Sequence, residues 1–161
     1  MFVLQPWIFL NVKYVLLDMK FLIKYYSIGG NTEAVANMIE KYIIDQGHSA
    51  SVTDIYNQEN IEEYDFIFIG SMTIGNGNVP PVVREYLKWL LTDNHFNLPS
   101  FSVFGTGDTQ WTYYCRAVDE IKYHICKKAK VVSTLKIEQH PINQKDKVAY
   151  YLENTFKEIN K

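Results

Sequence analysis

Short apolar runs alternate with amphipathic segments along most of the chain. The run Phe21–Tyr26 is followed closely by two glycines, which predicts a buried strand. Between Asn31 and Gln46 the apolar residues recur at helical spacing, and Gly47 comes next as a natural C-terminal stop. A strand is therefore followed directly by a helix.

The same alternation continues to the C-terminus. We expect further strands at Ser49–Tyr56, Asp65–Gly70, Phe101–Gly105 and Lys130–Ile137, and helices that begin at Pro80–Pro81, near Tyr114 and near Gln144. Parallel neighbours need right-handed crossovers, which the helices supply, so the pattern predicts a parallel sheet covered on both faces. The predicted fold class is α/β, a three-layer doubly wound sandwich around a five-stranded parallel sheet, in one domain over residues 19–161.

The first eighteen residues are apolar and raise the question of a membrane segment. They have no basic residue before the apolar run and no small-residue cleavage site. Pro6, Asn11 and Lys13 interrupt any span of about 20 residues. We interpret residues 1–18 as an extension outside the core, with Met19 as the natural start, and a membrane-associating segment is the alternative.

Composition and charge narrow the range of possible functions. The chain has 161 residues, of which 47% are hydrophobic and 21% charged, as in ordinary globular domains. Sixteen basic and eighteen acidic residues are interspersed, which argues against a nucleic-acid surface.

Cys115 and Cys126 lie in one predicted helix, about 16 Å apart, too far for a disulfide. Free thiols indicate a reducing, cytoplasmic setting. The four histidines are scattered, and no metal site is predicted.

In sheets of this kind, ligands bind at the carboxyl ends of the strands, so the loops there carry the function. The first such loop, Ser27–Thr32, combines hydroxyl, amide and glycine backbone groups with the positive end of a helix. It predicts a cradle for a monophosphate. It lacks the lysine of a triphosphate loop and the G-x-G-x-x-G of a dinucleotide site. A capped helix start with turn glycines is the alternative.

The second loop, Ser71–Pro81, has two glycines and two prolines. Strand-to-helix connections usually take 2 to 6 residues, so this loop is long for a plain connection. Gly75 and Gly77 let its backbone change dihedral angles at low cost. A glycine-rich surface loop without further role is the alternative.

The third loop, Gly105–Cys115, places Trp111, Tyr113 and Tyr114 just beyond a strand end. A large exposed aromatic ring predicts stacking on a flat ligand. Packing of the next helix onto the sheet is the alternative, and we favour it for Tyr114. Together the three loops predict a site for a phosphorylated, planar, aromatic ligand.

These loops resemble the motifs of the flavodoxin family, and the likeness runs from about Met19 to the C-terminus. Ser27–Thr32 is similar to S-x-T-G-N-T, Ser71–Pro80 to T-Y-T-W-G-D-G-E-L-P, and Gly105–Asp119 to G-S-G-D-x-x-Y-x-x-F-C-G-A-V-D. The resemblance implies strand order 2-1-3-4-5 and an FMN-binding, low-potential electron carrier without catalytic residues. The short link after Ile137 implies a short-chain member.

The resemblance also implies which residues bind FMN. The phosphate would be held by Ser27, Ile28, Gly29, Gly30, Asn31 and Thr32, and the ring by Ser71, Met72, Thr73, Ile74, Gly75, Asn76, Thr106, Gly107, Asp108, Trp111, Tyr113 and Cys115. Gly29 stands where the family usually has a hydroxyl, and Ile74 where an aromatic ring often covers the flavin. Asn76 and Asn78 replace the usual acids, which should raise the reduction potential because fewer carboxylates repel the reduced ring.

The implied partners are an NAD(P)H-dependent flavodoxin reductase and electron-accepting enzymes, met in transient contacts by a cytoplasmic monomer that binds neither nucleic acid nor membrane. Three alternatives stay open. One is an FMN-dependent NAD(P)H quinone or flavin reductase of the same fold. The others are a flavodoxin-like activator of a manganese ribonucleotide reductase and an interaction module that has lost its cofactor.

Overall fold

The computed structural model describes residues 18–93, 95 and 97–161. Its strands and helices alternate in the order β1 (Lys20–Tyr26), α2 (Asn31–Asp45), β2 (Ser49–Asp54), β3 (Phe66–Met72), α3 (Pro81–Lys88), β4 (Ser100–Gly107), α4 (Arg116–Ile125), β5 (Val131–Glu138) and α5 (Lys145–Ile159). A π-helical turn, Trp89–Asp93, extends α3, and short 3₁₀ turns lie at Ile61–Glu63 and Pro141–Asn143. Apart from Asp18, the proposed N-terminal extension lies outside the described residues.

All neighbouring strands pair in parallel, in the order β2-β1-β3-β4-β5, which confirms the predicted fold class and strand order. The chain runs outward from β1 to β2 and then crosses back to β3. The connections that leave β1 and β3 therefore go to opposite faces of the sheet, and a crevice opens between their carboxyl ends. This position is where the fold offers a binding site.

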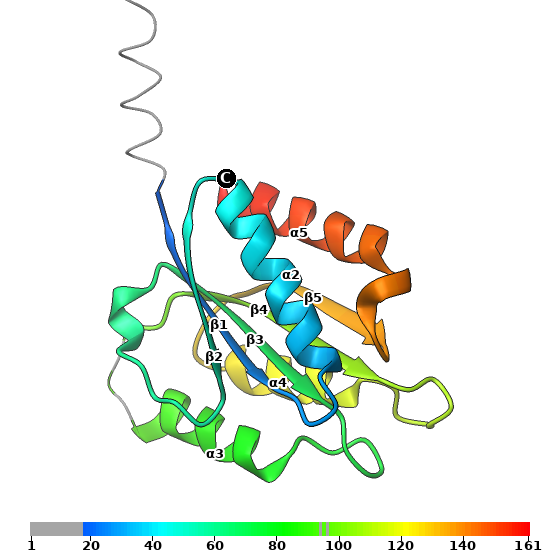
Figure 1. Cartoon of the computed structure of the whole chain (residues 1–161). Coiled ribbons are helices and arrows are strands. Elements are labelled where there is room, and N and C mark those ends of the chain that lie inside the picture. Colours follow the sequence, from blue (N-terminus) through cyan, green and yellow to red (C-terminus); the bar gives the residue numbers. More distant parts are fainter. Residues whose placement is uncertain (1–17, 94, 96) are drawn as a thin grey trace, which may run out of the picture.

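The helices cover the sheet in two pairs, α2 with α5 on one face and α3 with α4 on the other (Figure 1). Because side chains alternate along a strand, Phe21 and Ile23 of β1 pack under α2 and α5, whereas Leu22 packs under α3 and α4. Both faces of the central strands are buried, which explains why their sequences are continuously apolar. Within the described residues no helix is both long and apolar enough to cross a membrane.

Three details differ from the sequence prediction. Strand β2 ends at Asp54, two residues before the predicted Tyr56. Strands β3 and β4 each run two residues further than expected, because their ladder continues past the glycines and pairs Met72 with Thr106. The two cysteines flank α4 instead of lying in it. The backbone of Cys115 has φ of 49°, a left-handed conformation that ends the loop and lets the helix begin at Arg116. Both thiols are free, as predicted.

Candidate functional site

The loop after β1 forms a compact turn at the start of α2. Gly30 is the N-cap residue, with φ of +89°, a conformation that glycine adopts without strain. Its N–H donates to Ser27 Oγ at 3.0 Å. The first N–H groups of a helix have no partner inside the helix, so this end of α2 can receive an anion.

Two threonine hydroxyls form the floor beside this helix end. Thr32 is fully buried and Thr106 is 3% exposed, and their Oγ1 atoms lie 2.7 Å apart. The hydrogen bond joins α2 to β4 across 74 positions of sequence. Because one hydroxyl donates to the other, the second keeps its own proton for a further acceptor, such as a ligand oxygen.

The loop after β3 folds into a small hairpin. The backbone of Ile74 both donates to and accepts from Asn78, at 3.0 and 2.8 Å. Gly75 and Gly77 have φ of 50° and 86°. A Cβ on Gly77 would lie 2.3 Å from Tyr113 Cβ, so only glycine lets this hairpin contact the third loop.

The loop after β4 is braced by Asp108. Its Oδ1 accepts from the N–H of Gln110 at 2.8 Å and its Oδ2 accepts from Gln139 Nε2 at 3.2 Å. Its backbone carbonyl accepts from Trp111 N at 3.1 Å. The resulting turn leaves the indole of Trp111 65% exposed at the rim of the sheet. An exposed indole beside a cavity is suited to stacking against a flat ligand.

Cys115 closes the third loop as a packed thiol. It is fully buried, and its Sγ lies 3.6 Å from the carbonyl oxygen of Ile137. Burial raises the pKa of the Cys115 thiol to about 11. The thiol is therefore neutral at physiological pH and is no candidate nucleophile, since the thiolate is the reactive form.

Two adjoining cavities connect these three loops. The first, about 260 Å³, is lined by Ser27, Gly29, Asn31, Thr32, Met72, Thr73, Thr106, Gly107, Asp108, Trp111 and Gln139. The second, about 520 Å³, is lined by Met72, Thr73, Ile74, Gly75, Asn76, Gly107, Asp108, Trp111, Tyr113 and Cys115. Because they share five residues, we treat them as one trough that runs from the N-terminus of α2 to the hairpin. Its size is that of a small-molecule site.

Most residues expected at the site line this trough, but three do not. Ile28 is 73% exposed outside it, Gly30 shapes the turn through its backbone, and the buried hydroxyl of Ser71 donates to the carbonyl of Met72 at 2.7 Å. Sequence reasoning missed Gln139. It follows β5 at the same edge of the sheet, and a search of every strand end would have found it.

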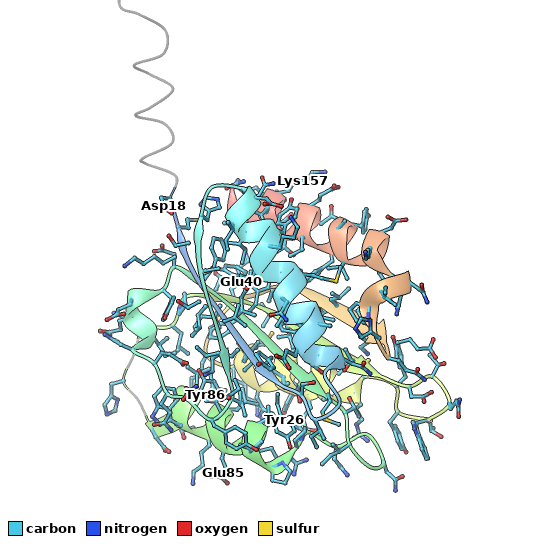
Figure 2. The ribbon with its side chains drawn as sticks, viewed as in Figure 1. Asp18, Tyr26, Glu40, Glu85, Tyr86 and Lys157 are labelled. Carbon is cyan, nitrogen blue, oxygen red and sulfur yellow. The ribbon has the colours of Figure 1, made fainter. Side chains whose placement is uncertain are left out.

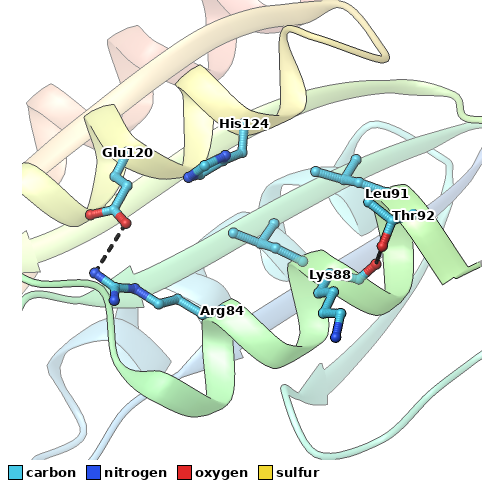
Figure 3. Close-up of a pocket in the computed structure, with 7 residues that line it drawn as sticks. Arg84, Lys88, Leu91, Thr92, Glu120 and His124 are labelled. Carbon is cyan, nitrogen blue, oxygen red and sulfur yellow. Dashed lines mark hydrogen bonds and ion pairs between the residues drawn. The ribbon is translucent and has the colours of Figure 1, made fainter.

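A second groove lies between α3 and α4, away from the trough. It measures about 450 Å³ and is lined in part by Leu87 and Leu91, with His124 on the facing helix (Figure 3). The guanidinium of Arg84 pairs with Glu120 across it at 3.2 Å. It contains none of the residues that the sequence motifs selected.

Comparisons with known proteins agree with this geometry. A family model described as Flavodoxin matches residues 23–151. Probable flavodoxin 2 of Bacillus subtilis is 30% identical over 132 residues, covering 79% of this chain and 87% of that protein. Flavodoxin of Maridesulfovibrio salexigens is 33% identical over 130 residues, covering 76% and 88%. The crystal structure of oxidised Flavodoxin 2 from Bacillus cereus superposes with a TM-score of 0.78 at 28% identity, covering 86% of this chain and 99% of that one.

Proposed function

The chain belongs to the flavodoxin family, as a short-chain member, and from that premise we propose that it holds one FMN in the trough and carries single electrons at low potential. Family and fold support an FMN-binding electron carrier. We further propose that an NAD(P)H-dependent flavodoxin reductase reduces it and that acceptor enzymes oxidise it in transient contacts. It would act as a cytoplasmic monomer, with residues 1–18 outside the FMN domain and no reaction of its own.

The observation that carries this proposal is the continuity of the trough. A helix N-terminus with two paired hydroxyls lies at one end, and an exposed indole facing a glycine hairpin lies at the other. FMN has the same order of parts: a phosphate, a polar chain and a flat ring. The donor groups at the first end suit an anion, and the shape of the second end suits an aromatic ring.

At the phosphate end we propose that Ser27, Asn31 and Thr32 hold the anion together with the N–H groups of α2. Gly29 supports the proposal only in part. A Cβ there would meet no atom within 4 Å, so a larger residue would fit and this position lacks a hydroxyl that the space allows. Thr106 keeps the hydroxyl of Thr32 in place from the neighbouring strand.

At the ring end, bound FMN would supply reversible uptake and release of electrons, and the chain supplies position and electrostatics. Trp111 would stack on the ring. The peptide between Gly75 and Asn76 can turn at low cost, so its carbonyl oxygen can accept a hydrogen bond from an N–H at the ring edge. Asn76 and Asn78 put no negative charge beside the ring, which would favour its reduced, anionic form compared with an acidic hairpin.

A comparison of FMN with riboflavin tests the proposal, because riboflavin lacks the phosphate. We expect the purified apoprotein to quench FMN fluorescence on titration and to bind riboflavin more weakly. Thr32→Val should weaken FMN binding and leave riboflavin binding unchanged. Thr155→Val is a matched control, since Thr155 is equally buried but hydrogen-bonded to Ser133 and Tyr151 far from the trough. If the protein is colourless after incubation with excess FMN and removal of the unbound FMN, the assignment is refuted.

The carrier and enzyme alternatives differ in one measurement. A carrier loaded with FMN should not oxidise NADH or NADPH until a reductase is added. Steady oxidation of either nucleotide by the pure FMN-loaded protein would instead identify it as a quinone or flavin reductase of the same fold.

A further inference from the structure

A lysine, Lys24, lies in the second half of β1, within the run Phe21–Tyr26 that is otherwise apolar. The side chain of Lys24 is 0% exposed. Its ammonium nitrogen is within hydrogen-bonding distance of four oxygens from the end of β2 and the segment that follows: Thr53 Oγ1 at 2.9 Å, the Asp54 carbonyl at 2.5 Å, the Asn57 carbonyl at 2.7 Å and Glu59 Oε1 at 2.8 Å. The buried ammonium of Lys24 therefore links β1 to the end of β2 and to the segment that follows β2.

The loop held in this way consists of residues 55–60, which form no regular helix or strand. The backbone hydrogen bond from Asn57 N to the carbonyl of Asp54 is long, at 3.4 Å. The hydroxyl of Thr53 also donates to Glu59 Oε1, so the carboxylate at the far end of the loop is tied back to the strand through the same centre. Lys24 therefore holds the middle and the far end of the 55–60 loop, whereas its near end is held by buried Ile55 and by the hydrogen bond from Tyr56 N to Asp54 Oδ1 at 3.0 Å.

This loop stands at the same edge of the sheet as the proposed FMN site. The register pairs Tyr25 with Asp54, so the 55–60 loop leaves β2 beside the point where β1 enters the phosphate cradle. Its Tyr56 is 68% exposed, and its ring lies 6.3 Å from that of Tyr26, edge to face. Tyr26 directly precedes Ser27 of the cradle. The 55–60 loop thus lies next to the phosphate cradle, although its residues do not line the trough.

Lys24 also contacts the helix that follows the glycine hairpin. Its ammonium lies 5.1 Å from the centre of the Tyr86 ring on α3, a cation–π distance. Figure 2 marks Tyr26 and Tyr86 on the side of the sheet that α3 covers. The hydroxyl of Tyr86 and the second carboxylate oxygen of Glu59 are buried without a hydrogen-bond partner. Burial of this cluster therefore costs free energy, so a contribution to stability does not by itself explain why the cluster is there.

The energetics of buried charge also argue against a purely stabilising role. Burial lowers the pKa of Lys24, and the ion pair with Glu59 only partly opposes this effect. Buried ion pairs can often be replaced by apolar residues with no loss of stability, whereas some of them select one conformation among several. A charge whose four oxygen partners join the end of β2 to an irregular loop fits the second role.

We propose that Lys24 is a positioning residue: it fixes the 55–60 loop in one conformation beside the phosphate cradle, where Tyr56 contacts Tyr26, and adds little to global stability. The ammonium acts as a tethered cation inside a cage of oxygens. Without it, the carbonyls of Asp54 and Asn57 would turn to water and the loop would open, while the sheet beneath stays intact.

Amide hydrogen exchange of the apoprotein, read by mass spectrometry, tests the proposal without any need for FMN. Lys24→Met keeps most of the apolar stem and removes the charge. We expect peptides that cover residues 55–60 to exchange at least about tenfold faster, since charge-assisted hydrogen bonds are lost. Since removal of Lys24 alone leaves the Glu59 carboxylate unpaired, the melting temperature is compared in Lys24→Met/Glu59→Gln, where it should fall by no more than a few degrees. This double variant removes the leftover carboxylate charge and should show the same faster exchange in residues 55–60.

The matched control is Lys41→Met/Asp45→Leu, which removes an exposed ion pair of 3.1 Å on α2. It should leave exchange in residues 55–60 unchanged. Unchanged exchange in the Lys24 variants would overturn the proposal. Faster exchange across all five strands with a large fall in melting temperature would also overturn it, because Lys24 would then be a general stabilising residue.

Chemical rescue separates charge from volume. Lys24→Ala removes three methylene groups and the ammonium, which together correspond to n-propylammonium. We expect n-propylammonium to restore slow exchange in residues 55–60 of Lys24→Ala, and n-propanol to have no effect. Equal rescue by both compounds, or by neither, would contradict a cation cage. A protein that passes these tests but binds no FMN would refute the proposed function and leave the role of Lys24 standing.

Discussion

Replacing the exposed indole tests the ring end of the trough, because Trp111 contributes little to the apoprotein and much to a stacked ligand. Trp111 is 65% exposed, so Trp111→Ala should change the apoprotein's melting temperature only slightly. A tryptophan of about 250 Å² with this exposure offers about 160 Å², of which one face, roughly 80 Å², can be covered by a flat ring. At about 25 cal/mol per Å², that burial stabilises the complex by about 2 kcal/mol.

This value agrees with the roughly 1–3 kcal/mol measured for base–aromatic stacking in other proteins. Since about 1.4 kcal/mol corresponds to a factor of ten, Trp111→Ala should raise the dissociation constant of FMN by about 10- to 30-fold. Fluorescence quenching of FMN during titration at fixed ionic strength measures the constant. Trp111→Phe should recover most of the affinity because a flat ring remains.

Tyr150→Ala is the matched control, since Tyr150 is 70% exposed on α5, away from the trough. It should leave the dissociation constant unchanged. If the FMN dissociation constant of Trp111→Ala lies within twofold of the wild-type value, the stacking model is refuted. An equal effect of the two substitutions would also count against it, because the loss would then be unrelated to the position of the ring.

Four further outcomes test other parts of the structure. Gly29→Ser adds a hydroxyl where there is free space, so FMN should bind about two- to tenfold more tightly while riboflavin binding stays constant. Gly105→Ala places a Cβ 2.5 Å from Val118 Cγ2, and chemical denaturation should show a loss of about 1–3 kcal/mol from overpacking. Cys126, which is exposed, should react with a thiol reagent at once, and buried Cys115 only after unfolding. Because the native pKa of Cys115 is raised from 9.0 to about 11, the native state keeps this proton longer than the unfolded chain, so the free energy of unfolding should fall as the pH rises through that interval, unlike that of Cys115→Ala.

The arrangement of strands and helices could be predicted because it follows from local patterns. Apolar runs, helical spacing and glycine or proline boundaries lie within a few residues of each other, and parallel strands joined by helices admit few topologies. The three loops could be found for the same reason, since each follows a strand end. Trp111 stood out because a large ring follows the end of a strand, and the structure leaves it exposed.

Contacts between distant segments could not be predicted, because they depend on strand register and loop conformation. The hydrogen bond of Thr32 with Thr106 requires α2 and β4 to meet. The bracing of Asp108 by Gln139 requires β4 and β5 to end at the same level. The sequence shows Lys24 only as one position of a buried strand, and nothing near it in sequence identifies its partners.

The sequence by itself determined the order of elements, the parallel sheet and the edge at which a ligand can bind, since these depend on periodicity and chain connectivity. Only the tertiary structure decided which groups share that edge: the paired hydroxyls, the braced indole, and the cage of oxygens around a buried ammonium. The physical reason is that hydrogen bonds and burial depend on distances between atoms from different segments, and packing sets those distances.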